Sequence, residues 1–371
     1  MTIGTILVTG ADGFIGRNLV LRLTEVGYRP IAITRASTAS QLADGITQAD
    51  AVVHLAGANR PQDPAEFMAI NRDASAALAD AIVAGGRALP VIVASSSRAG
   101  EDSDYGHSKL AGEQALAALG ERIGAAVHVF RLPNVFGKWA RPDYNSAVAT
   151  FCHRIARGTP IDIHDPAAPL RLVYVDDVVA AFLAILSDAP PAGQHEVSPM
   201  YDTTVGAVAD TIRGYAATRA TGIIGPVGTG LERALYATYV SHLSPESFSY
   251  PITTHSDPRG AFAEMLKTID SGQFSVFNAH PGVTRGGHYH HTKTEKFLIV
   301  HGRARFRFRH MITGDFHELD TSGDELRIVE TVPGWAHDVT NIGDELMISL
   351  LWANEIFDRQ KPDTIAAAVG A

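Results

Sequence analysis

Two groups of residues in this sequence have the types and the spacing that chemistry requires. The first lies in DYGHSKLAGEQAL, where Tyr105 and Lys109 are four residues apart. On a helix, these two side chains share one face. An ammonium beside a phenol stabilises the phenolate and so lowers a pKa that is ordinarily about 10. Tyr105 could then donate a proton to a carbonyl oxygen while a hydride reaches the carbon.

A hydroxyl that could polarise the same carbonyl precedes this segment. VIVASSSRAG has the apolar run of a buried strand and ends in Ser95, Ser96 and Ser97. A hydroxyl at a strand end can donate a hydrogen bond to a developing oxyanion. The residues alone leave the choice among the three serines open.

The second group lies in GVTRGGHYHHTKTEKFLIVHG, which contains His288, His290 and Glu295, and in PGWAHDVTN, which adds His337. Residues two apart on a strand point to the same face, so both histidines of the HxH pair would face the interior of a barrel. Glu295 and His337, on neighbouring strands, could complete a metal site. Three nitrogens and one carboxylate fit zinc, manganese, iron or nickel. We predict a divalent transition metal, with zinc as the first candidate.

The elements that position the first group begin at the N-terminus. TILVTG is a short apolar run, and RNLVLRLTEVG has apolar residues at helical spacing, so GADGFIG is predicted to be a strand-to-helix turn. Backbone amides at such a helix N-terminus can hold a pyrophosphate. We therefore predict a doubly wound, Rossmann-type α/β domain with a dinucleotide bound at Gly10, Gly13, Phe14, Ile15 and Gly16.

The second predicted strand, in PIAITRAST, indicates which dinucleotide. Arg35 follows this strand, at the position where an NAD enzyme carries the acidic residue that binds the ribose 2′-hydroxyl. An arginine there suits a 2′-phosphate, so NADPH is favoured. The alternative is a solvated surface arginine.

A change of pattern divides the chain near Ser244. SPESFSYPITTHSDPRG is rich in serine and proline. Beyond it, FSVFNAH, EKFLIVHG, RARFRFRH, LRIVETV and LMISLLW are short strand candidates separated by turn signals, which is typical of a small sandwich or barrel. We predict domains at residues 1–244 and 245–371. GIIGPVGTG, before this boundary, lacks the lysine of a phosphate loop and is interpreted as a flexible connection.

Composition limits the partners. The chain of 371 residues has a formal charge of -9 and no block of basic residues, so neither nucleic acid nor an anionic membrane is an expected partner. There is one cysteine, Cys152, no signal-peptide pattern and no apolar run of membrane-spanning length. We expect a cytoplasmic protein that acts on a small molecule.

The motifs resemble two known families. GxxGxxG, the serine-ended strand and YxxxK resemble the extended short-chain dehydrogenases/reductases. That resemblance implies cofactor contacts from Leu55, Ala56, Gly57 and Lys109, a catalytic hydroxyl on Ser97, and substrate contacts from Asn134 in RLPNVFGKW and Arg171 in LRLVYVDDVVAA. The histidine-rich segment matches the first cupin motif from Gly282 to Gly302, which implies an all-β jelly-roll barrel.

The whole chain resembles the CapF-type bifunctional enzymes of capsule and O-antigen synthesis. YGHSK, NVFGKWARPDYNSAVATFC, HYHHTKTEKF and WANEIFDRQKPDT carry this likeness. It implies that the cupin domain epimerises C3 of a UDP-4-keto-6-deoxy-HexNAc and that the Rossmann domain reduces C4 with NADPH. The product would be UDP-2-acetamido-2,6-dideoxy-L-talose, the precursor of UDP-N-acetyl-L-fucosamine, and the enzyme a homodimer.

Two other interpretations remain open from the sequence. In one, the chain is an NADPH-dependent 4-keto-sugar reductase whose cupin is structural or forms a dimer. In the other, it is a non-enzymatic NADPH sensor. Sensors of this kind generally lack the YxxxK pair, which this chain has, so the sensor ranks last.

Overall fold

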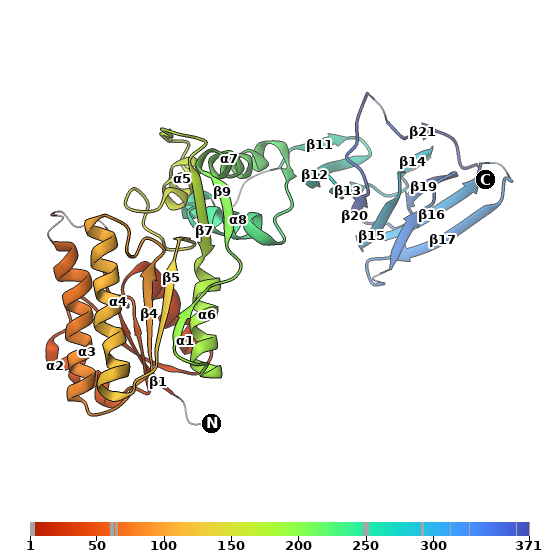
Figure 1. Cartoon of the computed structure of the whole chain (residues 1–371). Coiled ribbons are helices and arrows are strands. Elements are labelled where there is room, and N and C mark those ends of the chain that lie inside the picture. Colours follow the sequence, from red (N-terminus) through yellow and green to blue (C-terminus); the bar gives the residue numbers. More distant parts are fainter. Residues whose placement is uncertain are drawn as a thin grey trace. The chain divides into compact units, whose positions relative to one another are not determined.

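A computed structural model describes residues 4–59, 63, 66–247, 252–290, 293–311, 313–325, 327–360 and 362–370 (Figure 1). The chain forms two compact units. The first consists of Met1–Arg213 with Gly230–Leu243, and the second of Gly214–Thr229 with Ser244–Ala371. The second unit thus includes a segment that precedes the predicted boundary at Ser244.

A parallel six-stranded sheet in the order β2-β1-β3-β4-β5-β8 forms the centre of the first unit. Its strands are β1 (Thr5–Thr9), β2 (Arg29–Ile33), β3 (Ala51–His54), β4 (Val91–Ser96), β5 (Val127–Leu132) and β8 (Gly193–His195). All five residues of β1 are buried. Burial on both faces is what a near-continuous apolar strand in a parallel sheet requires.

Helices cover both faces of this sheet (Figure 1). One core joins Ile6 and Val8 to Leu19 and to Phe182. The other joins Leu7 to Ile46, Leu78 and Leu116. The helices that supply these side chains are α1 (Phe14–Glu25) and α6 (Val175–Asp188) on one face, and α2 (Ala39–Gln48), α3 (Ala74–Ala84) and α4 (Asp104–Ile123) on the other. The predicted doubly wound fold is confirmed.

A small second sheet and further helices follow. The sheet has the order β6-β7-β9. These strands and the remaining helical elements are β6 (Asn134–Phe136), β7 (Pro169–Tyr174), β9 (Tyr201–Thr204), the π-helix η1 (Met68–Asp73), α5 (Ala147–Ala156), α7 (Val205–Thr221), α8 (Gly230–Ser241) and the short η2 (Pro245–Ser247). Among the described residues, no helix combines the length and apolar character that crossing a bilayer requires.

Two β-sheets form the second unit, as the turn-separated strand pattern predicts. One has the order β10-β12-β13-β20-β15-β18, with β11 beside β12, and the other has the order β17-β16-β19-β14-β21. The strands are β10 (Ile223–Ile224), β11 (Thr254–Asp257), β12 (Gly260–Thr268), β13 (Gly272–Ala279), β14 (Thr284–Tyr289), β15 (Glu295–His301), β16 (Arg303–His310), β17 (Phe316–Ser322), β18 (Ile328–Thr331), β19 (Trp335–Asn341), β20 (Met347–Ala353) and β21 (Ile365–Ala366).

Alternate residues of these strands fill the space between the two sheets. Phe277 and Phe297 come from one sheet, and Phe306, Phe308 and Val339 come from the other. The period of two in RARFRFRH directs its phenylalanines inward and its arginines outward. GIIGPVGTG differs from its interpretation as a flexible connection, because its isoleucines form β10, which pairs with β12.

Candidate active site and metal centre

The glycine turn between β1 and α1 has the geometry that a pyrophosphate requires. Gly10 has a φ of +67°, and a Cβ there would lie 2.8 Å from the amide nitrogen of Ala56. A Cβ on Gly16 would collide with the carbonyl oxygen of Gly10. Gly13 is the N-cap of α1, no side chain caps this helix, and its first turn contains no acidic residue. The helix N-terminus is therefore available to an anion, and the turn fits a dinucleotide.

The other predicted cofactor residues follow neighbouring strands of the sheet. The backbone amides of Leu55 and Ala56, after β3, both contact the Thr9 hydroxyl, at 3.2 and 3.3 Å. A Cβ on Gly57 would lie 2.8 Å from the side-chain oxygen of Asn71. Arg35 is exposed in the turn after β2. All these residues lie at the carboxyl edge of the sheet, where ligands bind in open α/β folds.

Helix α4 places Tyr105 and Lys109 on one face, as their spacing predicts. Ser103 caps the helix, since its hydroxyl accepts a hydrogen bond from the amide of Gly106 at 3.1 Å. The Tyr105 ring packs edge-on against Phe67, with the centroids 5.6 Å apart, and the Arg98 guanidinium lies 5.8 Å from its centre. These contacts fix the direction in which the phenol points.

Two polar groups surround the Tyr105 hydroxyl. It donates a hydrogen bond to the side-chain oxygen of Asn59 at 3.3 Å. Burial raises the pKa of Tyr105, while a hydrogen bond with Ser96 and the charge of Arg98 act in the opposite direction. The net shift is upward, so the lowering expected from the neighbouring lysine is not found. The phenol stays protonated at neutral pH, which is the form that a proton donor needs.

Ser95, Ser96 and Ser97 have different environments. Ser95 is buried, and its hydroxyl has no hydrogen-bond partner among the described residues. The Ser96 hydroxyl interacts with Tyr105 and accepts the amide of Arg98 at 3.2 Å. Ser97 is exposed. The catalytic role expected of Ser97 stays a prediction, and Ser96 is the serine that the structure brings into contact with Tyr105.

Lys109 lies deeper than Tyr105. Its ammonium donates a hydrogen bond to the carbonyl oxygen of Ala94 at 3.3 Å. Burial lowers the pKa of Lys109 to about 8, against the opposing effect of the Glu113 carboxylate. Glu113 is 8% exposed and forms a two-pronged ion pair with Arg131, with a shortest distance of 2.7 Å. Lys109 is thus coupled to a second pair of charges, of which Glu113 is buried and Arg131 is partly exposed.

From the sequence, Asn71 is either an ordinary structural residue or the proton-relay asparagine that the resemblance to short-chain reductases suggests. The structure places it between the loop after β3 and α4. Its side chain accepts the Ala58 amide at 2.9 Å and donates to the Ala58 carbonyl at 3.2 Å and to the Ser108 hydroxyl at 3.0 Å. Asn71 lies in the π-helix η1, and π-bulges are frequent at functional sites. It holds the loop after β3 against α4, and only the structure reveals the irregular helix that directs it there.

The two predicted substrate residues lie together on the small sheet. The side-chain amide of Asn134 donates a hydrogen bond to the carbonyl oxygen of Arg171 at 3.2 Å. The guanidinium of Arg171 lies 3.5 Å from the carboxylate of Asp202. Both predicted residues are exposed, so they are accessible to a ligand. Their contact with the substrate stays a prediction.

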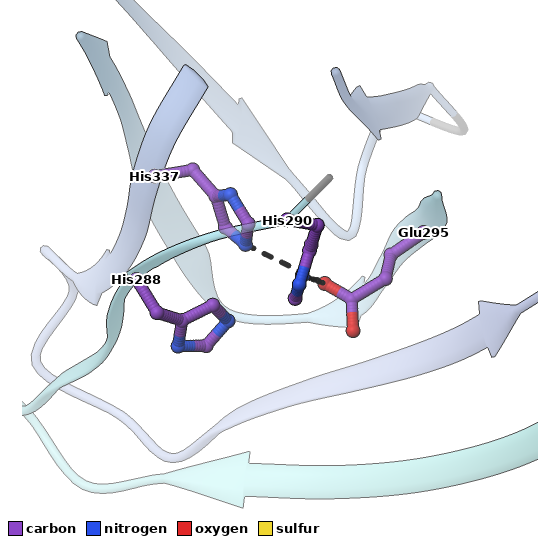
Figure 2. A group of neighbouring side chains, drawn as sticks. All are labelled: His288, His290, Glu295 and His337. Atoms are coloured by element: carbon purple, nitrogen blue, oxygen red, sulfur yellow. Dashed lines mark hydrogen bonds and ion pairs between the residues drawn. The ribbon is translucent and has the colours of Figure 1, made fainter. Parts of the chain in front are cut away.

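In the second unit, the four predicted metal ligands converge (Figure 2). One potential ligand atom from each of His288, His290, Glu295 and His337 lies within 4.8 Å of all the others. His288 on β14 is directly opposite His337 on β19, with ring centroids 4.7 Å apart. Glu295 is the first residue of β15. The pairing of β14 with β19 therefore brings together His288 and His337, which are 49 positions apart in the sequence.

Hydrogen bonds set which imidazole nitrogens can bind a metal. Nδ1 of His290 lies within hydrogen-bond distance of the carbonyl oxygen of Asp363. A carbonyl can only accept, so Nδ1 carries a proton. Nε2, 3.3 Å from the Glu295 carboxylate, is then the nitrogen that could bind a metal. Asp363 is a second supporting residue that sequence reasoning missed, because it lies 73 positions away.

His337 supplies the observation that tests the fit of a metal. Its Nε2 is buried, lies 3.5 Å from Glu295 Oε2 and has no hydrogen-bond partner among the described residues. A buried polar atom without a partner is costly, and a metal ion would satisfy it. Three imidazoles and a carboxylate form a donor set that suits zinc and its neighbours. The residues present thus fit a divalent transition metal.

The electrostatics of the cluster favour the metal-binding forms of its side chains. Burial raises the pKa of Glu295, but contacts with His290 and His337 and the Lys293 ammonium, 2.9 Å away, outweigh burial and hold it well below its usual range. Burial, reinforced by His337, lowers the pKa of His288 to about 4. At neutral pH, the carboxylate is charged and the imidazole is neutral, as ligands must be.

Two family models match the chain. The model of the NAD-dependent epimerase/dehydratase family matches residues 6–197, more than half of the 371 residues. The chain belongs to this family. The model of the polysaccharide biosynthesis C-terminal domain matches residues 255–365. The first description supports a nicotinamide cofactor for the glycine turn.

Two relatives that are similar over the full length of the chain indicate which group within the family it resembles. The chain is 53% identical to a Pseudomonas aeruginosa protein, UDP-2-acetamido-2,6-beta-L-arabino-hexul-4-ose reductase, over 98% of this chain and 99% of that one. The crystal structure of the capsular polysaccharide assembling protein CapF from Staphylococcus aureus matches with a TM-score of 0.91 and 38% identity, over 98% of this chain and all of that one. The resemblance to CapF-type enzymes is confirmed.

A more distant match concerns the first unit. UDP-glucose 4-epimerase from Thermotoga maritima aligns with a TM-score of 0.56 and 21% identity, over 64% of this chain and 98% of that one. At this identity, the likeness indicates a shared fold.

Proposed function

We propose that this enzyme converts a UDP-4-keto-6-deoxy-HexNAc in two steps, C3 epimerisation in the second unit and C4 reduction in the first. The product is UDP-2-acetamido-2,6-dideoxy-L-talose, an intermediate for UDP-N-acetyl-L-fucosamine in capsule or O-antigen synthesis. The observation that carries the proposal is the convergence of four metal-binding atoms in a chain that matches, end to end, a relative named as a keto-sugar reductase.

In the reduction, the first unit supplies the proton and holds the reactants. NADPH, when bound at the glycine turn, provides the hydride. Tyr105 gives its proton to the ketone oxygen, and the Lys109 ammonium stabilises the phenolate left behind. Ser97, exposed at the end of β4, is our proposed donor to the same oxygen, with Ser96 engaged instead by Tyr105. Asn134 and Arg171 are the proposed contacts to the nucleotide.

In the epimerisation, the second unit makes a C–H bond beside the ketone acidic. A divalent metal, with zinc as the first candidate, would supply Lewis acidity when held by His288, His290, Glu295 and His337. The order of the steps follows from the chemistry. Reduction removes the ketone and with it the acidity of its neighbours, so the new configuration can no longer revert.

Deuterium exchange tests the assignment of two activities. In deuterium oxide and without NADPH, the intact, metal-loaded protein is expected to exchange the C3 hydrogen of a UDP-4-keto-6-deoxy-HexNAc, because enolisation needs no hydride. Mass spectrometry or NMR of the recovered sugar measures the exchange. Absence of exchange would reduce the function to a 4-keto-sugar reductase with a structural second unit.

Arg35 is expected to set the preference for NADPH over NADH. The Arg35→Asp variant should bind NADPH one to two decades more weakly, because it loses a charge-assisted phosphate contact of about 1.5–3 kcal/mol. Steady-state kinetics with both cofactors measure the change. Arg29→Asp, an exposed arginine at the opposite end of β2, is the matched control. An unchanged ratio between the cofactors in Arg35→Asp would make Arg35 a surface charge.

The pH dependence of reduction is expected to follow the pKa of Lys109. Burial lowers the pKa of Lys109 to about 8, so the ammonium, and with it the rate, should be lost as pH rises through about 8. The Glu113 carboxylate raises the pKa of Lys109, so Glu113→Gln should move this midpoint to lower pH. Profiles of kcat/KM for the free enzyme measure both. A midpoint unmoved by Glu113→Gln would contradict the coupling.

We further propose a cytoplasmic homodimer. The single cysteine, Cys152, is buried and unpaired, which suits a reducing compartment. Sedimentation equilibrium is expected to give the mass of two chains, and a single-chain mass would contradict the dimer.

A further inference from the structure

The cavity of the second unit has a charged side chain that the metal site does not use. A volume of about 170 Å³ opens between the two sheets. Its lining includes three of the metal ligands, four phenylalanines and one arginine, namely His288, Glu295, His337, Phe262, Phe277, Phe297, Phe306 and Arg285. Arg285 lies on β14, three residues before the ligand His288.

Arg285 is held in place without its charge being neutralised by an ion pair. Its guanidinium donates a hydrogen bond to the carbonyl oxygen of Asn278 at 3.0 Å and lies 5.1 Å from the centre of the Phe277 ring. Among the described residues, no carboxylate forms an ion pair with it. The nearby Asp257 is bound through both oxygens by Arg259, at distances down to 2.5 Å.

The two acidic residues in the lining of the cavity, Asp338 and Glu295, also have other partners. Asp338 forms a two-pronged ion pair with Arg307, at 2.9 and 2.7 Å. Glu295 belongs to the metal cluster and pairs with Lys293. The guanidinium of Arg285 therefore has no carboxylate in direct contact, and its charge is offset only by the more distant Asp257. Burial and the charge of Arg259 lower its pKa, which means that an anion beside it would be stabilising.

The size of the cavity indicates which part of a ligand reaches Arg285. A volume of about 170 Å³ is below the roughly 300–1,000 Å³ of pockets that enclose a whole ligand. It suits a single sugar ring, so a nucleotide attached to that ring must extend outward. His290, Glu295 and His337 are buried, whereas Arg285 and His288 are partly exposed. Arg285 is thus accessible to solvent as well as to the cavity, as a contact to the anionic linkage of a nucleotide sugar would require.

We propose that Arg285 binds the diphosphate of the nucleotide sugar and so positions the sugar ring against the His288, His290, Glu295 and His337 cluster. This inference rests on the proposed function, and it assigns to the second unit its own nucleotide-recognition site. A planar guanidinium can donate two parallel hydrogen bonds to phosphate oxygens, which gives orientation as well as affinity.

Two measurements on the intact, metal-loaded protein test this role. Titration calorimetry with UDP is expected to show two classes of site in the wild type, one in each unit. Arg285→Met should weaken one class by roughly 10- to 100-fold, the cost of losing a charge-assisted contact. Arg285→Lys should restore part of it. The control Arg303→Met removes an exposed arginine outside the cavity lining and should change neither class.

The second measurement is the C3 exchange. Arg285→Met is expected to raise KM for exchange at least tenfold with a much smaller change in kcat, and to leave reduction of an already epimerised ketone unchanged. Metal content equal to that of the wild type verifies that the variant is folded. An unchanged KM, or a wild type with a single class of UDP site, would overturn the role of Arg285.

The two proposals fail in different ways. If the wild type exchanges no deuterium at C3, the epimerase function is wrong, and the UDP titration still decides whether Arg285 binds a nucleotide. If exchange occurs and Arg285→Met behaves as the wild type in both measurements, the epimerase stands and the role of Arg285 is wrong.

Discussion

Tyr105→Phe is expected to slow reduction of the C4 ketone by about 10²–10⁴-fold, the usual contribution of a positioned general acid. The substitution removes one hydroxyl and keeps the ring. Its edge contact with Phe67 and the position of Arg98 above it should therefore persist. What is lost is the proton that the ketone oxygen must receive as the hydride arrives. Oxidation of NADPH in the presence of the 4-keto sugar measures the rate.

Two controls separate this chemical effect from a structural one. Tyr28→Phe removes a phenol just before β2, at the amino end of the strand, and should leave reduction unchanged. Tyr105→Phe itself should bind NADPH and exchange deuterium at C3 as the wild type does, because exchange belongs to the second unit. Near-normal turnover with intact cofactor binding would remove Tyr105 from the mechanism.

The opposite pattern is expected for His290→Ala. Loss of one of four ligands should release the metal on dialysis and abolish C3 exchange, while reduction of an already epimerised ketone continues. The effect should be large, since the variant also loses the hydrogen bond between His290 and the carbonyl oxygen of Asp363. Elemental analysis gives the metal content, and deuterium incorporation gives the activity.

An exposed histidine on the next strand along the chain provides the matched control. His301→Ala, at the end of β15, lies outside the cluster and should retain both metal and exchange. Full metal retention in His290→Ala, or a wild type that binds no metal, would contradict the assignment of the four ligands.

The parts of the site that are local in sequence could be predicted. The strand-turn-helix of the glycine motif, the i, i+4 pair on α4 and the alternation of His288 and His290 depend on backbone periods that a short segment contains. The position of Glu295 and His337 beside His288 and His290 could also be predicted, because a motif with fixed spacing implies a fixed strand register. The boundaries of β13, β15, β16 and β20 agree with the apolar runs to within a few residues.

Other parts depend on contacts that no local pattern contains. Asn71 acts through a π-helix, an irregularity without a sequence period. Glu113, on helix α4, gains its role from Arg131 on strand β5. β10 consists of two isoleucines whose partner strand, β12, begins 36 positions later, so their pairing could not be inferred from a glycine-rich stretch. The sequence also could not show that Arg285 lacks an ion pair, because Asp257 and Asp338 pair with other arginines only in the folded structure.

The hydrogen bond between His290 and Asp363 ties the end of the chain to the metal site. The same C-terminal segment pairs β21 with β14, accepts the guanidinium of Arg309 at Ala368, and buries Val369 to 2% exposure. Binding of the proposed metal and docking of this segment should therefore be coupled, because a segment that orients a ligand is stabilised in return when the ligand binds. If the four side chains hold a metal as proposed, a change that loosens residues 363–369 should also weaken metal binding, even without touching a ligand.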